Sequence, residues 1–286
     1  MRALFLIPGD SVSQLQALPA VAATAAQLDA QVQVACRPDA AGVWKLLPAV
    51  EKTLPVSFEQ ASLADWANLL GLVREPDFQA CVNLLAGGPG SRAVDWLLSM
   101  SHIPTRVASA GFSATERIAP PQNGWPAQGL QAWLRPLGVR LEAASYRLSL
   151  ARADLEAATA SLPAGQGPML LLAPAGGGGD WPAARWQELP GRIRSRVPDL
   201  RCHTLPPAGG GAGMRERAAL LAASDLVLAS DPATVELALL CGLPLVALGR
   251  APASLPSRQG VAGLGEGGTS LQDLPLDPVL QALGLG

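Results

Sequence analysis

Short apolar runs alternate with longer segments of helical periodicity along the first third of the sequence. The runs consist mainly of apolar side chains, which is typical of strands buried on both faces of a sheet. These predicted strands are residues 3–7, 32–36, 52–56, 79–84 and 105–108, the last as an edge strand. Apolar residues at spacings of three and four predict helices at residues 12–28, 40–47, 65–73 and 91–100. Strands and helices in alternation indicate βαβ units and a parallel sheet.

The alternation stops after residue 108 and resumes at residue 169. Between them only residues 130–137 and 151–162 have helical patterns, so we interpret this segment as a connection between two lobes. The second series predicts strands at residues 169–173, 201–205, 225–229 and, as the last strand, 244–248. It predicts helices from Pro182 onward and at residues 214–223, 234–241 and 277–283, with a glycine-rich loop at 206–213. The sequence therefore predicts an α/β protein with two Rossmann-like, doubly wound parallel-sheet domains, residues 1–160 and 161–286, facing each other across a cleft.

Composition narrows the classes of function. Of the 286 residues, 49% are apolar and 15% are charged, and the formal net charge is −2, so the chain is globular and lacks a basic surface for nucleic acid. The two histidines and four cysteines have no metal-binding spacing, so we expect neither a metal nor a cofactor. Lys45 and Lys52 are the only lysines, which excludes a P-loop. The apolar run at residues 237–249 is too short to span a membrane, and we expect a cytoplasmic protein.

Three loops follow predicted strands at the carboxyl edges of the sheets, where open parallel sheets bind ligands. The first loop, residues 8–13, carries Asp10 and Ser13. A carboxylate at this place can act as the general base that takes the proton of an acceptor hydroxyl. The alternative is that Asp10 only caps the following helix.

The second loop follows residues 169–173 and contains four consecutive glycines, Gly176, Gly177, Gly178 and Gly179. Glycine allows the backbone to approach a ligand closely, so amides at the start of a helix can bind a pyrophosphate there. The alternative is a flexible surface loop. Trp181 and Arg185 follow, and Arg185 is a candidate cation for the phosphates.

The third loop consists of Ser230, Asp231, Pro232, Ala233 and Thr234. Its hydroxyls and amides can bind diphosphate or ribose oxygens, whereas the alternative is that Asp231 caps the helix without a ligand. Glu236 adds a second negative charge, so a bound anion requires a compensating cation, for which Arg250 is a candidate.

Longer stretches of the sequence resemble one family. The opening, LFLIPGDSVSQLQALPAVAA, is similar to its first strand, GD-containing loop and Leu-Pro-Ala helix. The stretch LLLAPAGGGGDWPAARWQELPGRI is similar to its H-P-G-A-G…K-x-W-P region. The stretch RERAALLAASDLVLASDPATVELALLCGLPLVALG is similar to its region around D-S/T-G-x-x-H. On these motifs the chain resembles the ADP-heptose:lipopolysaccharide heptosyltransferases of glycosyltransferase family nine, which have the GT-B architecture.

The resemblance implies an inverting, metal-independent bacterial glycosyltransferase of lipopolysaccharide biosynthesis. It implies that residues 161–286 bind a nucleotide-diphosphate sugar, with an ADP-sugar favoured, and that residues 1–160 bind a lipid-linked glycan acceptor. Such a protein works in the cytoplasm at the inner face of the cytoplasmic membrane, with at most peripheral membrane contact.

The family's site residues carry over unevenly. Aligned without a gap, its catalytic aspartate falls on Ser13, and Asp10 takes this role if the loop is shifted by three residues. Its lysine before W-P falls on Gly179, and its D-S/T-G-x-x-H string keeps Asp231 but has Glu236 in place of the histidine. These departures leave a second hypothesis open, a catalytically degenerate GT-B scaffold that acts as a binding or assembly protein. A third hypothesis is a GT-B-like epimerase or small-molecule sensor.

Overall fold

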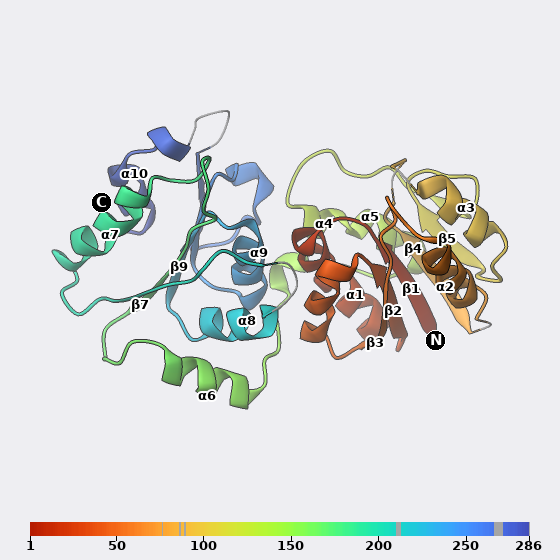
Figure 1. The fold of residues 1–286 in the computed structure, drawn as a ribbon, viewed down its shortest axis with the longest axis horizontal. Coiled ribbons are helices and arrows are strands. Elements are labelled where there is room, and N and C mark those ends of the chain that lie inside the picture. Colours follow the sequence, from red (N-terminus) through yellow and green to blue (C-terminus); the bar gives the residue numbers. More distant parts are fainter. Residues whose placement is uncertain (76, 86, 89, 210–212, 266–270, 286) are drawn as a thin grey trace. The chain divides into compact units, whose positions relative to one another are not determined.

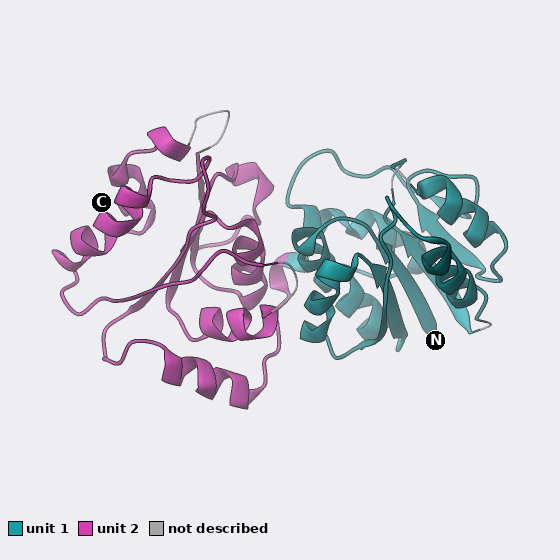
Figure 2. Cartoon of the chain, in the orientation of Figure 1, with its two compact units in different colours: residues 1–143, 210–212 teal, residues 144–209, 213–286 magenta. Residues whose placement is uncertain are grey.

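The computed structural model describes residues 1–286 except residues 76, 86, 89, 210–212, 266–270 and 286. The described chain forms two compact units (Figure 2). Unit 1 contains Met1–Ala143, and unit 2 contains Ala144–Gly209 and Gly213–Gly286. The units divide between residues 143 and 144, whereas the sequence places the domain boundary between residues 160 and 161. Of the glycine-rich loop predicted at 206–213, residues 210–212 lie outside the described residues.

Unit 1 is built on a parallel sheet (Figure 1). Its strands are β1 (Arg2–Ile7), β2 (Gln31–Cys36), β3 (Val50–Pro55), β4 (Phe78–Asn83), β5 (Thr105–Ala108) and β6 (Glu116–Arg117). Their order in space is β3-β2-β1-β4-β5-β6, so the direction of winding reverses between β1 and β4. Because β5 pairs with both β4 and β6, the prediction of an edge strand at residues 105–108 is wrong. The outer strand, β6, consists of two exposed charged residues and therefore gives no apolar signal.

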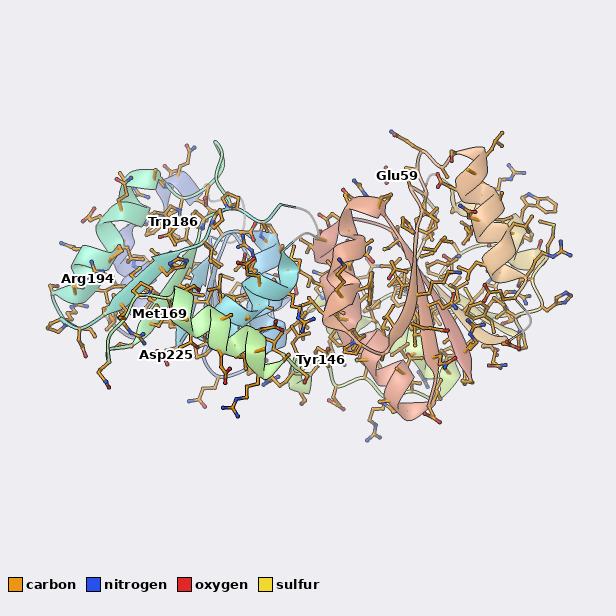
Figure 3. All side chains as sticks on the ribbon, turned by 60° about the horizontal axis from the view of Figure 1, so that its bottom comes forward. Glu59, Tyr146, Met169, Trp186, Arg194 and Asp225 are labelled. Carbon is orange, nitrogen blue, oxygen red and sulfur yellow. The ribbon has the colours of Figure 1, made fainter. Side chains whose placement is uncertain are left out.

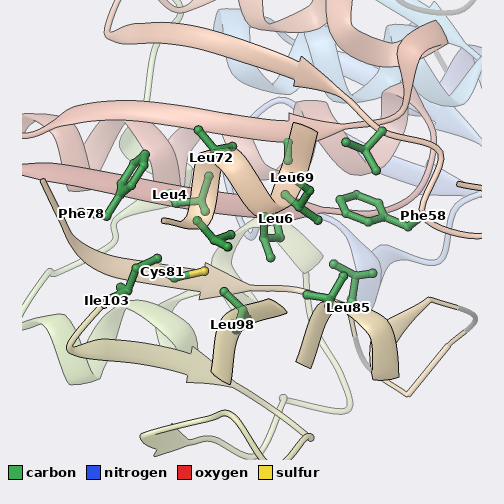
Figure 4. Close-up of a cluster of buried hydrophobic side chains, with 14 residues drawn as sticks. Leu4, Leu6, Phe58, Leu69, Leu72, Phe78, Cys81, Leu85, Leu98 and Ile103 are labelled. Carbon is green, nitrogen blue, oxygen red and sulfur yellow. The ribbon is translucent and has the colours of Figure 1, made fainter. Parts of the chain in front are cut away.

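Helices cover both faces of this sheet. They are α1 (Ser11–Gln27), η1 (Pro38–Leu46), α2 (Leu63–Val73), α3 (Ser91–Ser99), α4 (Pro126–Gly129), α5 (Gln131–Leu134) and the 3₁₀ turn η2 (Arg135–Leu137). Successive side chains of β1 point to opposite faces, and Leu4 and Leu6 pack in a buried cluster with Leu69 and Leu72 of α2 and Leu98 of α3 (Figure 4). On the other face, α1 packs against β1 and β2, and η1, α4 and α5 contact α1.

Unit 2 is built on a second parallel sheet (Figure 1). Its strands are β7 (Met169–Ala173), β8 (Arg201–Thr204), β9 (Leu226–Ala229), β10 (Leu245–Leu248) and β11 (Val261–Leu264). Their order is β11-β10-β9-β7-β8, so the winding reverses between β7 and β9. The prediction that residues 244–248 form the last strand is wrong, because β11 follows at the edge. A Cβ at Gly263 of β11 would lie 2.4 Å from the Arg250 carbonyl oxygen, so packing requires the glycine that weakens the strand signal.

Helices also cover both faces of the second sheet. They are α6 (Arg152–Ser161), α7 (Ala183–Arg194), α8 (Met214–Ala222), α9 (Pro232–Cys241) and α10 (Leu276–Ala282), with 3₁₀ turns η4 (Pro252–Ser254) and η5 (Leu271–Asp273). The 3₁₀ turn η3 (Ala143–Ser145) spans the division between the units. Leu170 and Leu172 of β7 pack in one buried cluster with residues of α7 and α10, among them Trp186 (Figure 3). The α9 helix contacts β9, β10 and α8, and α8 contacts α6. The Met169 amide donates to Asp225 Oδ2 at 2.7 Å, which ties the start of β7 to the turn before β9 (Figure 3).

Candidate functional site

The loop after β1 lies where the winding of the first sheet reverses, which is where doubly wound sheets bind ligands. Asp10 in this loop is the N-cap of α1. Its Oδ1 accepts hydrogen bonds from the amides of Val12 and Ser13, each at 3.1 Å, and from the Ser13 hydroxyl at 3.3 Å. Asp10 is exposed, and Oδ2 accepts no hydrogen bond from any described residue. The two residues predicted for this loop therefore form one group with a carboxylate oxygen open to a ligand.

A small cavity of about 140 Å³ adjoins this loop at the carboxyl ends of β1, β2 and β3. It is lined by Pro8, Gly9, Arg37, Ser57, Phe58, Glu59 and Gln60, of which Glu59 is labelled in Figure 3. Arg37 donates to Asp39 through two hydrogen bonds, of 2.7 and 3.1 Å. The hydrogen bonding of this pair raises the pKa of the Arg37 guanidinium and lowers the pKa of the Asp39 carboxyl. Charged and amide groups at this cavity suit the polar groups of a ligand.

In unit 2 the winding reverses between β7 and β9, and the loops after these two strands are hydrogen bonded to each other. The Ala175 amide donates to Ser230 Oγ at 2.8 Å. The amides of Ser230 and Asp231 donate to the Ala173 carbonyl at 3.0 and 3.1 Å. The fold thus brings the second and third predicted ligand loops together at one edge of the sheet.

The glycine loop folds around one of its own side chains. Asp180 is buried, and its two oxygens accept hydrogen bonds from the Gly176 amide at 2.9 Å and from the Trp181 amide at 2.7 Å. Residues 177–179 are exposed, with open space at each Cβ position. The Asp180 carboxylate therefore accepts a hydrogen bond from the Gly176 amide, one of the amides predicted to bind a phosphate. The next three residues lie at the surface.

Trp181 and Arg185 hold the C-terminal segment against this loop. Trp181 Nε1 donates to the Leu274 carbonyl at 2.8 Å, and its ring meets Trp186 edge to face with centroids 5.2 Å apart. Arg185 Nη1 donates to the carbonyls of Leu274 and, at 2.8 Å, Gln272. These bonds occupy Arg185 Nη1, so a phosphate contact by Arg185 uses the other N–H groups of the guanidinium or displaces one of these carbonyls.

Asp231 is the N-cap of α9, and Pro232 stands in the first turn of that helix. Asp231 Oδ2 accepts hydrogen bonds from the Thr234 hydroxyl and, at 2.8 Å, from the Thr234 amide. Arg217 of α8 donates from Nη1 to Thr234 Oγ1 at 2.8 Å and from Nη2 to the Pro206 carbonyl. Burial lowers the pKa of the Arg217 guanidinium, and the charge of Asp231 opposes this effect. The hydroxyl of Thr234 is thus fixed between an acid and a cation.

Arg217 is absent from the residues that sequence reasoning assigns to the site. It lies on a helix whose apolar pattern gives no sign of a ligand, and only the packing of α8 against α9 brings it to Thr234. The available signal is the shortage of lysine. Both lysines, Lys45 and Lys52, belong to unit 1, so arginine is the permanently charged cation that unit 2 can supply at this edge.

Glu236 of α9 is fully buried and paired with Arg250, which follows β10. The Arg250 Nη2 to Glu236 Oε1 distance is 3.0 Å, and 20% of the Arg250 side chain is exposed. The pair joins the carboxyl end of β10 to α9 and balances a charge that burial would otherwise disfavour.

The described residues contain no group of three or more histidine, cysteine, aspartate or glutamate side chains placed to hold a metal ion. Burial raises the pKa of the Cys36, Cys81 and Cys241 thiols to about 12, so they are neutral near pH 7. Within the same part of the chain, every helix is too short or too polar to cross a membrane.

The two α/β units, each built on a parallel sheet, have the GT-B class of fold, as comparison with solved structures shows. The structure is similar over 99% of the chain to ADP-heptose LPS heptosyltransferase II of E. coli, with a TM-score of 0.72, 16% identity and 98% of that chain covered. It is similar over the same share to a glycosyl transferase of family 9 from Veillonella parvula DSM 2008, with a TM-score of 0.71, 13% identity and 96% coverage. The E. coli heptosyltransferase WaaC with ADP-2-deoxy-2-fluoro heptose gives a TM-score of 0.69, 16% identity and 99% coverage of both chains.

These similarities confirm the predicted resemblance to heptosyltransferases at the level of the fold. Neither a protein-family model nor a curated protein sequence matches the chain.

Proposed function

We propose that this protein is an inverting, metal-independent glycosyltransferase that transfers a heptose-like sugar from a nucleotide-diphosphate sugar, preferably an ADP-sugar. The acceptor is a lipid-linked glycan of the lipopolysaccharide type, which the protein meets at the inner face of the cytoplasmic membrane. The observation that carries the proposal is the fold shared with heptosyltransferases over 99% of the chain. One of those structures holds an ADP-heptose analogue, which supports the class of donor.

In this proposal unit 1 binds the acceptor, and Asp10 is the general base. The acceptor oxygen attacks the anomeric carbon of the donor, its proton passes to Asp10 Oδ2, and the nucleoside diphosphate leaves with the electrons of the broken bond. The hydrogen bonds of Oδ1 to Val12 and Ser13 fix the carboxylate while Oδ2 stays open. Capping and catalysis are therefore compatible, because they use different oxygens.

Unit 2 binds the donor in this proposal. The amides of residues 177–179 and of Ala233 in the first turn of α9 stabilise the charge that develops on the leaving diphosphate. Arg217 supplies a positive charge beside Thr234, in the absence of a lysine at Gly179. The carboxylates of Asp231, Asp180 and Glu236 are all engaged by internal donors, which reduces their repulsion of an anion.

Donor binding is tested by thermal-shift and calorimetric titration of the full chain with ADP-, GDP- and UDP-sugars. A ligand present at about 100 times its Kd stabilises the folded state by about 2.7 kcal/mol, which is a clear thermal shift. Transfer to a lipid-linked acceptor is then followed by release of the nucleoside diphosphate with and without EDTA, and the anomeric configuration of the product is read by NMR. If no nucleotide sugar binds at millimolar concentration, the proposal fails.

A second candidate function is a degenerate GT-B scaffold that binds or assembles without transfer. The observation that favours it is the hydrogen bond from the Gly176 amide to the Asp180 carboxylate, together with Gly179 at the position that the resemblance gives to the family's lysine. This function predicts that Asp10→Ala leaves the cellular phenotype intact. Loss of glycan transfer in that variant would exclude it.

A further inference from the structure

An exposed apolar patch of unit 1 is formed by Trp96 and Met100 at α3 and by Phe112 in the loop between β5 and β6. These side chains are 57%, 50% and 54% exposed, and they are three of the five large apolar side chains exposed among the described residues. The rings of Trp96 and Phe112 meet edge to face with centroids 5.1 Å apart. Met100 follows Trp96 by four residues, which places both on the same side of α3 (Figure 1). Single apolar side chains at a surface are ordinary, whereas a contiguous set marks an interaction surface.

The loop between β5 and β6 holds Phe112 at the surface in a fixed conformation. Gly111 has a φ of +106°, and a Cβ there would lie 2.3 Å from both carboxylate oxygens of Asp95, so the residue before Phe112 must be glycine. The Ser113 hydroxyl donates to Asp95 Oδ1 at 2.5 Å, and the Ser113 carbonyl accepts from Arg106 Nε at 2.7 Å. The backbone on both sides of Phe112 is thus tied down, so its exposure is a built feature of the fold.

The surface of α3 beside the patch is positively charged. Between residues 90 and 115 the single acidic residue is Asp95, which is buried. Arg92 is exposed one helical turn before Trp96 and has no hydrogen bond or ion pair with another described residue. The positive charge of Arg92 is therefore available to an anionic partner.

A second arginine lies on the other side of the patch. Arg117 of β6 is exposed, and its Nη2 donates to the Gly111 carbonyl at 2.9 Å, which places the guanidinium beside Phe112. Glu116 is its neighbour in the strand, so the two side chains point to opposite faces of the sheet. Each of the two aromatic residues of the patch is thus accompanied by an exposed arginine.

The size and chemistry of the patch suit a lipid surface better than a folded protein. The exposed parts of the three side chains amount to roughly 300–400 Å², whereas each partner of a stable protein complex buries about 800 Å². Aromatic rings are enriched at the headgroup level of membranes, and arginine is attracted to anionic lipids. A few apolar side chains with basic neighbours are the composition by which a protein surface lies on a membrane.

We propose that the apolar patch inserts into the headgroup region of a membrane that contains anionic phospholipids, with Arg92 and Arg117 on the lipid phosphates. The inference rests on the proposed function for its role, since a lipid-linked acceptor lies in such a membrane. The loop of Phe112 and the loop of Asp10 leave the sheet at the carboxyl ends of its parallel strands. Docking through the patch therefore brings the edge that carries the candidate base to the membrane surface.

The test measures binding of the full chain to lipid vesicles in the absence of nucleotide and acceptor. Sucrose-loaded vesicles of phosphatidylcholine alone, or of an equimolar mixture with phosphatidylglycerol, are sedimented, and the bound fraction gives a partition coefficient. Phe112→Ser removes an apolar side chain of the patch, and Arg92→Gln removes a charge. The matched controls are Leu63→Ser and Arg196→Gln, since both parent residues are exposed outside the patch. Circular dichroism melting verifies that each variant folds.

A second readout locates the inserted residue. Trp96 is exposed, whereas the other six tryptophans are buried or half-buried. Brominated acyl chains quench tryptophan fluorescence at the membrane, so vesicles that contain them should quench the wild-type protein. Trp96→Phe keeps an apolar ring and should keep the partition coefficient within about threefold, but the quenching should be lost.

We expect saturable binding to the anionic vesicles that falls about tenfold on phosphatidylcholine alone, or when salt is raised from about 0.1 M to about 1 M. Phe112→Ser should lower the partition coefficient on anionic vesicles by about tenfold and Arg92→Gln by about fivefold, with both controls at the wild-type value.

Three results would overturn the inference: absence of binding to anionic vesicles, equal binding by Phe112→Ser and Leu63→Ser, and quenching that persists in Trp96→Phe. A dimer in sedimentation velocity that Phe112→Ser dissociates would assign the patch to a second copy of the chain and would overturn it as well. If the vesicles bind as expected but no nucleotide sugar does, the proposed transferase function fails while the patch remains a membrane-binding surface.

Discussion

In both units the winding of the sheet reverses beside its first strand. The loops at the carboxyl edge of that reversal are built differently in the two units. In unit 1 the residues around the reversal leave a cavity of about 220 Å³ and an exposed carboxylate oxygen on Asp10. In unit 2 the loops after β7 and β9 are joined by the bond from Ala175 to Ser230. Asp180 and Asp231 there accept hydrogen bonds from their own loops.

The difference shows that polar side chains at a ligand edge serve two purposes that sequence alone does not separate. A side chain whose hydrogen-bonding atoms are engaged by internal partners fixes the backbone. A ligand at that edge is then bound by backbone amides and by the shape of the site. A side chain with an open atom is able to react. Unit 1 therefore has the features of a reactive edge, and unit 2 those of a preorganised binding edge.

The largest effect expected from this comparison is that of Asp10→Asn on transfer. Asparagine caps a helix as well as aspartate, so the free energy of unfolding should change by less than about 0.5 kcal/mol. Loss of the general base should lower the rate of sugar transfer by about 10²- to 10⁴-fold. The measurement pairs a transfer assay with urea unfolding.

Asp231→Asn is the matched variant in unit 2, because Asp231 also caps a helix. Its effect on kcat should be less than about tenfold, since its carboxylate is already bonded to Thr234 and takes no proton. Equal losses of kcat in the two variants would remove the distinction between the edges.

The next effect is on the stability of unit 2. Glu236→Ala leaves Arg250, which is largely buried, without its acid, and the free energy of unfolding should fall by about 3 kcal/mol. Glu188→Ala removes an exposed partner of Arg192 at 3.9 Å and should cost less than about 1 kcal/mol. Urea unfolding followed by tryptophan fluorescence measures both. A Glu236→Ala variant as stable as Glu188→Ala would show that the buried pair contributes little.

A smaller gain is expected when a cation is added to the glycine loop. Gly179 has open space at its Cβ position and no positive φ, so Gly179→Lys should fold normally. A charge-assisted contact with a phosphate should lower the Kd for ADP by about tenfold in calorimetry. Gly191→Lys, on the exposed side of α7, is the control and should leave this Kd unchanged. Unchanged affinity in Gly179→Lys would place the diphosphate elsewhere.

The smallest effect is on thiol reactivity, which should differ between the buried thiols of unit 1 and Cys202 of unit 2. Cys36 and Cys81 of unit 1 are fully buried, and burial raises their pKa to about 12. Reactivity requires the thiolate, so both thiols should resist iodoacetamide at pH 8 and should gain reactivity only as the pH approaches 12 or the unit unfolds. Half-buried Cys202 of unit 2 has a raised pKa as well but should be alkylated first, as peptide mass spectrometry will show. Alkylation of Cys81 before Cys202 would show that Cys81 is not buried in the core of unit 1.

Much of this fold is predictable from the sequence because strands in doubly covered parallel sheets form continuous apolar runs. The segment 169–173 illustrates this, since predicted and observed bounds of β7 agree. The two errors both concern sheet edges, β6 and β11. An edge strand is short and partly exposed, so it needs few apolar residues, and the glycine at position 263 further obscures β11.

The candidate site is less predictable than the fold. Local patterns indicate the loops of Asp10, Gly176 and Asp231, because these loops follow buried strands directly. Which atoms stay open depends on partners distant in sequence. Arg217 reaches Thr234 from another helix, and Trp133 reaches the loop of β1 from the far end of unit 1. Such contacts leave no periodic signal.

The pairing of β1 with β4 across the reversal also sets a sequence of events during synthesis on the ribosome. The nascent chain offers β2 to β1 early, whereas β4 and then α5 emerge much later. Until β4 arrives, one edge of β1 has no native partner strand. The edge between β1 and β4 is thus among the last parts of unit 1 to mature, and a translational pause before β4 prolongs the interval in which the open edge of β1 can recruit a foreign strand.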